Sequence, residues 1–543
     1  MKNKYPQWLN DAVIYNIFPA SFYDSNGDGI GDLAGIIQKL NYIQSLGVNL
    51  IWINPVFDSP FQDGGYDVRD YYKIAPRYGK NSDISKLCKE AKKRGMRIML
   101  DLVPGHTSIE HPWFKSSASA EKTEYDNRYV WTDYIFRNAP GIFLGGDTGR
   151  SGKYLINFFS FQPALNYGYL NPKEPWQLPI SHPDCVATRN ELKKIMDFWL
   201  KKGVSGFRVD IANSLVKDDV NCKGLKIIYS DLRQWLDCNW PDAALLAEWS
   251  MPTDAVRCGF HMDFVLHSTP EFTQLFRMEQ KANVDQNSEG GISFFRKVSG
   301  GSCKPFLDYF QKQWKSVNHK GLISFPTGNH DLPRIAFERT PAELKAAYGF
   351  IFTLPVAPAL YYGDEIGMRY LPHSPNREGA YHRAGSRTPM QWDDSKNDGF
   401  SSAVARKIYL PQDENKNRPT VAKQEDDRNS LLNFTRRLIA LRKKYPELGP
   451  CGDFTVLYAG TDSKAVIYCR SGKNRTLIIA LNPGGQDVTA FVHLNGGLSC
   501  LLSSGTITAV PNDGGLEFYF SGISFAAFEL IKEIKNEHEK RKK

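Results

Sequence analysis

Short apolar runs alternate with sequence of helical periodicity over most of the chain, and this alternation constrains the fold more than any other feature. The eight runs are 12–18, 49–57, 97–103, 206–211, 243–249, 262–267, 322–327 and 359–362. Helical spacing fills several intervals, as at 33–46, 84–94 and 189–201. A β/α alternation predicts a parallel sheet, and eight strands with intervening helices are what a (β/α)8 TIM barrel requires. A doubly wound open sheet is the alternative, but that fold needs no eighth strand.

Two departures from this alternation predict further structural units. After residue 103 about eighty residues rich in aromatics, glycine and proline interrupt it, which is typical of a functional insertion. A helix at 430–445 closes the region, and the runs 454–458, 465–468, 476–481 and 524–530 beyond it have β character. The prediction is an α/β barrel (1–103 and 189–448) with an inserted subdomain (104–188), a C-terminal antiparallel β domain (449–535) and a charged tail (536–543).

Composition narrows the function classes. The 543 residues are 41% hydrophobic and 23% charged, as in an ordinary globular protein. The net charge of +9 comes partly from the tail, so nucleic acid binding is not indicated. The nine cysteines form no C-x-x-C pair, and neither a signal sequence nor an apolar run long enough for a membrane span is present. We therefore expect free thiols, a cytoplasmic location and no membrane partner; the sequence leaves the oligomeric state open.

The stretch Gly206-Phe207-Arg208-Val209-Asp210 places two charges at the end of a predicted buried strand. Residues two apart on a strand face the same side. An unpaired charge in an apolar setting costs several kcal/mol, so Arg208 and Asp210 are expected near other polar groups. In a parallel barrel the carboxyl ends of the strands form the ligand-binding face, where such a pair belongs.

Further polar residues follow other predicted strands, namely Asp101, His106, Glu248, His330 and Asp331. A single aspartate in such a place is more often a helix cap, and a lone histidine is usually structural. Together, however, these residues would converge on one end of one barrel. The joint pattern predicts an active site.

The segments that carry these residues resemble the four conserved regions of the α-amylase superfamily, glycoside hydrolase family 13. The matching segments are 101–108 (DLVPGHTS), 206–210 (GFRVD), 246–249 (LAEW) and 328–331 (GNHD). The likeness is greatest to the oligo-1,6-glucosidase, α-glucosidase and trehalose-synthase group. It implies that Asp210 is the nucleophile, Glu248 the general acid/base and Asp331 the transition-state stabiliser. It also implies that Arg208, His106 and His330 line the sugar subsite.

These residue types suit the chemistry of retaining glycosidases. Such an enzyme uses one ionised carboxylate to attack the anomeric carbon and one protonated carboxyl to serve the leaving oxygen, about 5 to 5.5 Å apart. Arg208 is expected to keep Asp210 ionised by lowering its pKa. Glu248 must instead hold its proton until the leaving oxygen needs it.

Two further segments resemble the elements with which exo-acting α-glucosidases close one end of their cleft: 63–67 (DGGYD) and 383–392 (RAGSRTPMQW). By this likeness Asp63 and Arg387, with Arg383 beside them, hold the non-reducing glucose while Tyr66 stacks on its face. Phe158 and Gln162 match the contribution of the inserted subdomain to the same pocket. A surface turn with an ordinary ion pair is the alternative, which is disfavoured because the two segments occur together.

The loop 24–32 (DSNGDGIGD) has oxygen side chains at alternating positions, as in a calcium loop. A set of Asx turns before the helix at Leu33 would need no metal. The family likeness favours a bound Ca²⁺ or Mg²⁺, with no organic cofactor. Its ligands would be Asp24, Asn26, Asp28, Asp32 and the Ile30 carbonyl.

The chain also departs from the family pattern. Gly105 stands where an asparagine is usual, and Ala164 replaces an acidic residue. Ile211, directly after the expected nucleophile, is branched, as is the valine that accompanies α-1,6 activity in relatives. Ile211 therefore hints at isomalto-type linkages.

The leading functional interpretation is a retaining, exo-acting α-glucosidase that acts on short α-linked gluco-oligosaccharides or disaccharides. An α-glucosyl transferase or isomerase, of the trehalose-synthase or sucrose-isomerase type, would use the same catalytic residues. A non-catalytic binding relative is disfavoured because Asp210, Glu248 and Asp331 are all present.

Overall fold

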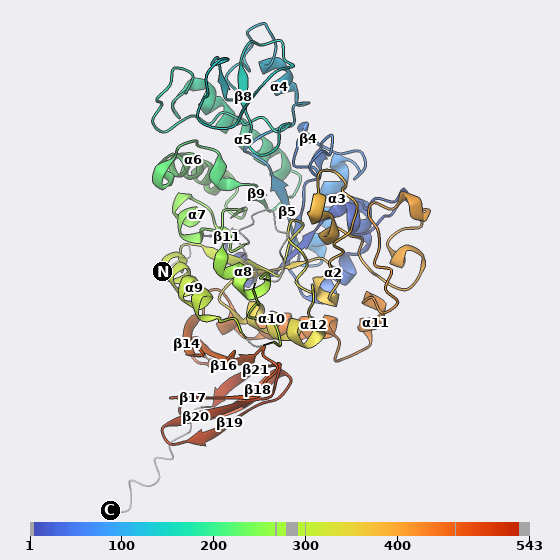
Figure 1. Cartoon of the computed structure of the whole chain (residues 1–543), viewed down its shortest axis with the longest axis vertical. Helices are drawn as coiled ribbons and strands as arrows, with labels where there is room; N and C mark the ends of the chain where they lie inside the picture. The colour runs from blue at the N-terminus through green and yellow to red at the C-terminus, as the bar shows by residue number, and fades with distance from the viewer. Residues whose placement is uncertain (1–4, 267–268, 279–290, 299, 462, 532–543) are drawn as a thin grey trace, which may run out of the picture.

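A closed barrel of eight parallel strands forms the body of the protein (Figure 1). The computed structural model describes residues 5–266, 269–278, 291–298, 300–461 and 463–531. In barrel order the strands are β1 (Ile14–Ile17), β13 (Ala357–Tyr361), β12 (Leu322–Pro326), β11 (Met262–Phe264), β10 (Ala244–Ala247), β9 (Gly206–Val209), β5 (Arg97–Leu102) and β2 (Leu50–Ile53). The predicted (β/α)8 barrel is confirmed. His267, at the end of the sixth predicted run, lies outside the described residues.

Local chemistry explains where elements differ from the predicted ranges. The run 49–57 is divided at Pro55, which has no N–H for a ladder bond: β2 is followed by β3 (Phe57–Asp58), which pairs with β4 (Asp70–Ile74) outside the barrel. The helix predicted at 33–46 is two helices, α1 (Leu33–Gln38) and α2 (Leu40–Leu46).

The other helices are α3 (Asn81–Lys93), α5 (Pro183–Leu200), α6 (Lys223–Asn239), α7 (Pro252–Cys258), α8 (Pro270–Phe276), α9 (Lys304–Val317), α10 (Pro341–Thr353), α11 (Val421–Glu425) and α12 (Leu431–Lys444). They surround the barrel strands (Figure 1). The helix α5 begins six residues before the predicted Arg189, because His182 caps its amino end and Pro183 suits the first helical position. Single 3-10 turns lie at Gln7–Asp11, Pro19–Ser21, Ala212–Ser214, Val220–Cys222, Asp364–Ile366, Tyr381–Ser386, Lys396–Gly399, Ala405–Lys407 and Pro446–Leu448.

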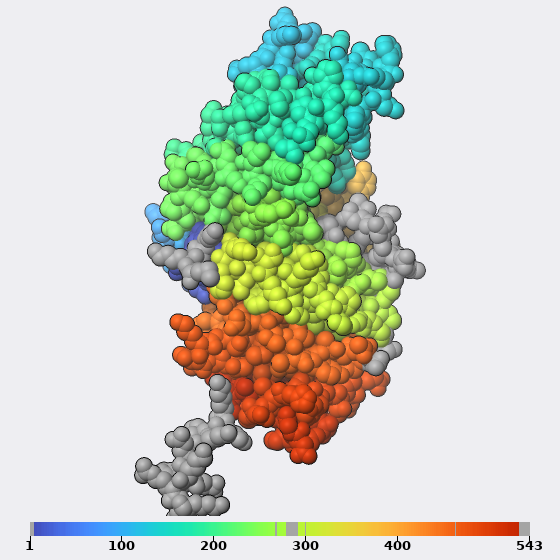
Figure 2. Space-filling model, turned by 90° about the vertical axis from the view of Figure 1, so that its left-hand side faces the viewer, coloured from blue at the N-terminus to red at the C-terminus, as the bar shows by residue number. Residues whose placement is uncertain are grey.

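The insertion after β5 folds into a small unit beside the carboxyl ends of the strands. It contains α4 (Pro112–Ser117) and a sheet of β6 (Trp131–Thr132), β8 (Lys153–Leu155) and β7 (Phe143–Gly145). Val130, Leu155, Ala164 and Tyr169 form a core of its own. This unit lies at the opposite end of the molecule from the C-terminal strands (Figures 1 and 2).

The C-terminal part is an antiparallel β structure, as predicted. One sheet has the order β14-β15-β16-β21-β18 and the other β17-β20-β19. The strands are β14 (Asp453–Ala459), β15 (Val466–Ser471), β16 (Thr476–Asn482), β17 (Val488–Val492), β18 (Gly497–Ser504), β19 (Ile507–Asn512), β20 (Gly515–Phe520) and β21 (Ser524–Ile531). The predicted tail, 536–543, lies outside the described residues.

Each of the nine cysteines, all in described positions, is a free thiol, as predicted. Over the described ranges, no helix has both the length and the apolar character that crossing a bilayer requires.

Candidate active site

One buried arginine gathers three carboxylates at the carboxyl end of the barrel. Arg208, on β9, lies beside Asp101 of β5 in the parallel register. Its Nη1 is 2.7 Å from Asp101 Oδ1 and 2.8 Å from Asp210 Oδ1, and its Nη2 is 2.6 Å from Glu248 Oε1. The two predicted catalytic carboxylates, Asp210 and Glu248, therefore contact different nitrogens of the same guanidinium.

The charge balance of this cluster differs from the prediction. Burial raises the pKa of Asp210 well above its usual range, and the charges of Glu248 and Asp101 add to this, although Arg208 lowers it. Burial likewise raises the pKa of Asp101 to about 6. The effect expected of Arg208 is present, but the predicted net lowering of the Asp210 pKa is wrong. One cation faces two buried carboxylates, Asp101 and Asp210, and the partly exposed Glu248, so burial and mutual repulsion outweigh the attraction of Arg208.

Glu248 follows β10 directly and is the most exposed of the three carboxylates. The exposed fractions of the Asp101, Asp210 and Glu248 side chains are 0, 8 and 18%. Glu248 Oε2 accepts a hydrogen bond of 2.9 Å from the backbone N–H of Ile211. Ile211 has φ 37° and ψ 53°, a left-handed conformation that is strained by roughly 1–3 kcal/mol for a branched residue. This strained backbone holds the Glu248 carboxylate in place.

Asp331 lies among basic side chains beyond β12. His330 Nε2 is 3.0 Å from Asp331 Oδ2, while Arg383 Nη1 and Arg387 Nη2 are 3.0 and 2.9 Å from Oδ1. Burial alone would raise the pKa of Asp331, but these three neighbours hold it well below its usual range. Asp331 is therefore ionised, whereas the pKa values of Asp101 and Asp210 are raised.

Asp63 forms a wall of the site together with the inserted subdomain. Arg383 Nη2 donates to Asp63 Oδ1 at 3.1 Å, and Gln162 Nε2 donates to Asp63 Oδ2 at 2.9 Å. Because Arg383 also contacts Asp331, it bridges two acidic residues that are far apart in the sequence. The predicted Asp63, Gln162, Arg383 and Arg387 are thus brought together.

Tyr66 and the two predicted histidines form another side of the site. The Tyr66 ring stacks on His330, with centroids 5.2 Å apart and an interplanar angle of 9°, and its hydroxyl donates to Asp101 Oδ2 at 3.0 Å. His106 Nε2 is 3.2 Å from the Tyr66 carbonyl oxygen. Phe158 is 49% exposed and contacts the ring of Phe159. The role of Phe158 in the pocket stays a prediction.

Two residues of this network, Asn54 and Trp52, were missed in the sequence. Asn54 Nδ2 is 3.0 Å from both the Tyr66 hydroxyl and His330 Nδ1, and Trp52 Nε1 donates to Asp101 at 3.2 Å. Both belong to the second apolar run. The available signal was Asn54, a polar residue directly after the strand.

The space beside Gly105 explains its departure from the family pattern. A Cβ at position 105 would lie 2.8 Å from Asn157 Nδ2 and 2.9 Å from Ser214 Oγ. Asn157 donates to His106 Nδ1 at 3.1 Å and accepts a hydrogen bond of 3.0 Å from Lys217 Nζ. An asparagine from the inserted subdomain therefore occupies the space that a side chain at 105 would take.

The loop 24–32 curls around its own side chains. Asp24 accepts hydrogen bonds from the N–H groups of Gly27 and Gly29, Asn26 from that of Asp28, and Asp28 from that of Ile30. Asp32 caps α1 through Gly35 N. No group of three or more His, Cys, Asp or Glu suited to a metal occurs among the residues the structure describes. The Asx turns are observed, and the metal stays a prediction.

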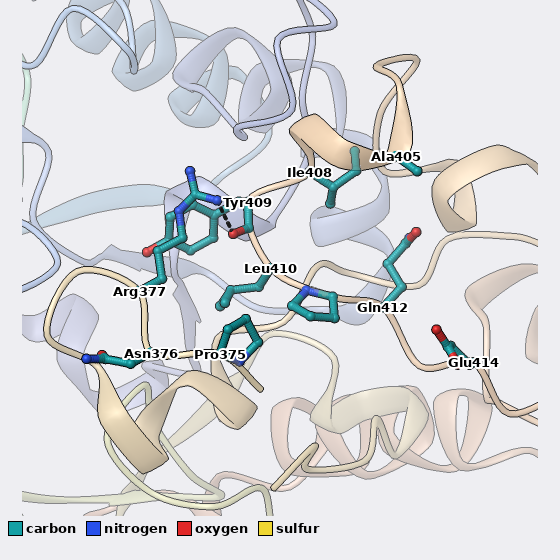
Figure 3. A pocket seen from close by; sticks show the side chains of 10 residues that line it. Pro375, Asn376, Arg377, Ala405, Ile408, Tyr409, Leu410, Gln412 and Glu414 are labelled. Carbon is teal, nitrogen blue, oxygen red and sulfur yellow. Dashed lines mark hydrogen bonds between the residues drawn. The ribbon is translucent and has the colours of Figure 1, made fainter. Parts of the chain in front are cut away.

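A separate hollow of about 710 Å³ lies in the segment after β13 (Figure 3). Pro375, Arg377, Leu410 and Gln412 are among its lining residues, and Arg377 Nη1 donates to the Tyr409 carbonyl at 2.6 Å. None of the predicted site residues lines it. The hollow is therefore distinct from the carboxylate cluster.

A TIM barrel with paired carboxylates at the carboxyl ends of its strands defines the class of barrel glycoside hydrolases. The catalytic-domain model of the α-amylase family matches residues 16–449. The chain belongs to the α-amylase family and is an enzyme of the glycoside hydrolase type. Each of the four predicted motifs lies within the matched range.

Similar proteins of known sequence are named glucosidases and trehalose synthases. A trehalose synthase/amylase of Mycolicibacterium smegmatis is 32% identical over 85% of this chain and 80% of its own length. An oligo-1,6-glucosidase of Parageobacillus thermoglucosidasius is 31% identical over 88% of this chain and 90% of its own. Among solved structures, an isomaltulose synthase of Erwinia rhapontici with sucrose has a TM-score of 0.77 at 26% identity, covering 97% of this chain and 99% of that one.

Proposed function

We propose that the protein cleaves α-glucosidic bonds from the non-reducing end with retention, through a glucosyl ester on Asp210. The observation that carries this proposal is the shared guanidinium of Arg208, which holds Asp210 and Glu248 on adjacent nitrogens. In the productive state Glu248 is protonated and Asp210 is ionised. Asp210 attacks the anomeric carbon while Glu248 protonates the departing oxygen. Glu248 then takes a proton from a water molecule, whose oxygen bonds to the anomeric carbon as the ester bond to Asp210 breaks and glucose is released.

The exo mode is supported by the wall of Asp63, Gln162, Arg383 and Asp331. These side chains hold one another in place through hydrogen bonds and ion pairs. Their remaining donors and acceptors can then bind the hydroxyls of one terminal glucose. An internal glucose unit would need the chain to continue through this wall. The same residues therefore favour a pocket closed at one end.

A transferase or isomerase is the second candidate, because a relative named trehalose synthase is similar in sequence and an isomaltulose synthase shares this fold. The two functions differ only in whether water or a sugar hydroxyl attacks the glucosyl ester. Acceptor capture therefore decides between them.

Products on isomaltose, maltose, sucrose and trehalose provide the test. We expect glucose as the main early product, with isomaltose consumed faster than maltose because of the branched Ile211. An isomeric disaccharide formed without free glucose, measured by chromatography, would establish the transferase instead.

Arg383→Ala should raise KM more than it lowers kcat, since the Arg383 guanidinium binds the substrate and does not react with it.

We also propose that the loop 24–32 binds Ca²⁺ through Asp24, Asn26, Asp28, Asp32 and the Ile30 carbonyl. Carboxylate, amide and carbonyl oxygens are the donors that Ca²⁺ prefers, and the Asx turns already curl the loop around them. When bound, the ion would supply positive charge to this loop and take no part in the reaction.

Thermal unfolding with CaCl2, MgCl2 or EDTA tests this site. An ion that binds only the folded state adds about 2.7 kcal/mol to the free energy of unfolding at a hundredfold excess over Kd, and this raises Tm. We expect Ca²⁺ to raise Tm in the natural protein and not in Asp28→Ala. An unchanged Tm in the natural protein would mean that the Asx turns suffice.

A free-thiol state for all nine cysteines supports a reducing compartment, and we propose a cytoplasmic location on that ground.

A further inference from the structure

The two histidines of the site are held by the same device. Asn54 Nδ2 lies 3.0 Å from His330 Nδ1, and Asn157 Nδ2 lies 3.1 Å from His106 Nδ1. The other ring nitrogen faces an acceptor in both cases. His330 Nε2 is 3.0 Å from Asp331 Oδ2, and His106 Nε2 is 3.2 Å from the Tyr66 carbonyl oxygen.

The orientation of each asparagine amide is set by a group on its oxygen side. Lys217 Nζ, which can only donate, is 3.0 Å from Asn157 Oδ1. Asn16 Nδ2 donates to Asn54 Oδ1 at 3.0 Å and also to the Trp52 carbonyl at 3.3 Å. Both amides therefore present their NH2 groups, not their oxygens, to the imidazoles.

We propose that Asn54 and Asn157 are positioning residues that keep His330 and His106 neutral, with the ring proton on Nε2. An amide NH2 facing Nδ1 makes that nitrogen an acceptor, and a second ring proton would place two donors against each other. His330 then donates to Asp331, the predicted transition-state stabiliser. His106 donates to the backbone that carries Tyr66.

The surrounding charges agree with neutral rings. Burial lowers the pKa of His330 to about 4, although Asp331 raises it, and Arg387 and Arg208 lower it further. Burial lowers the pKa of His106 to about 3, with Lys217 acting in the same direction. The charge beside Asp331 therefore does not change near neutral pH. The effect on catalysis rests on the proposed function, whereas the assignment of the two histidine tautomers does not.

Asn54→Asp tests the proposal because a carboxylate is nearly the same shape but can only accept. It should draw a proton to His330 Nδ1 and produce an imidazolium near neutral pH. The readout is the ¹⁵N spectrum of histidine-labelled protein without substrate, with the His330 signals assigned through His330→Gln. We expect an unprotonated Nδ1 in the natural protein and a protonated Nδ1 in Asn54→Asp.

Activity gives a second readout. We expect kcat/KM of Asn54→Asp to fall about 10- to 100-fold, as for partners that orient functional histidines elsewhere, and to acquire an ionisation between pH 5 and 8. Asn166→Asp is the matched control, because Asn166 is buried but bonds Gly168 and Cys185 instead of a histidine. That control should leave both histidine signals and the pH profile unchanged.

If Asn54→Asp does not fold, Asn157→Asp on the half-buried subdomain loop makes the same test on His106. A natural protein with protonated Nδ1 at either ring overturns the proposal. So does a variant whose facing histidine keeps an unprotonated Nδ1. Correct tautomers in a protein without glucosidase activity would instead contradict the proposed function alone.

Discussion

Asp210→Ala is expected to lower kcat on natural α-glucosides by on the order of 10⁴-fold or more, because no covalent intermediate can form. Azide should restore activity on p-nitrophenyl α-glucoside, whose leaving group needs no proton. It would enter from the side that the carboxylate vacated, so the product is the β-glucosyl azide. Product configuration is read by proton NMR.

Glu248→Ala is the paired variant that separates the two roles. Here Asp210 still forms the glucosyl ester with the activated substrate, and azide attacks that ester from the opposite face. We therefore expect the α-glucosyl azide. The opposite pattern of configurations would exchange the two assignments, and Asp308→Ala, an exposed aspartate paired with Lys304, controls for contaminating activity.

The sequence predicted the barrel because its signal is local and repeated. Each strand is a short apolar run, and the polar residue directly after it is brought to the same rim whatever the intervening helix does. Arg208, Asp210 and Glu248 could thus be assigned to one site. Two of the misplaced boundaries, at Pro55 and Pro183, depend on single proline positions within longer patterns.

The electrostatic state of the site could not be predicted in the same way. The sequence shows that Arg208 is two residues from Asp210, but not that Asp101 and Glu248 share the same buried guanidinium. Likewise, Gly105 signals a missing side chain without indicating that Asn157 fills the space from the subdomain. Such features depend on contacts between segments that fold from separate parts of the chain.

Arg208→Met should be the most destabilising change at the site. Removing one partner of a buried ionic network costs about 3–5 kcal/mol, because the remaining charges stay buried. Without Arg208 the folded-state pKa values of Asp101 and Asp210, already raised by burial, should rise further above their unfolded values. A carboxyl whose folded pKa exceeds its unfolded value contributes stability below the unfolded pKa and loses it as pH rises through the folded pKa.

The stability deficit of Arg208→Met should therefore be larger at pH 7 than at pH 5, as measured by urea unfolding. Arg442→Met is the matched control, because that buried guanidinium donates to the backbone carbonyls of Phe352 and Leu354 and not to carboxylates. Its deficit should be similar at both pH values, since no raised carboxyl pKa depends on it. A deficit of Arg208→Met that is equally independent of pH would mean that Arg208 acts through packing. The excess negative charge would then not set the protonation of the cluster.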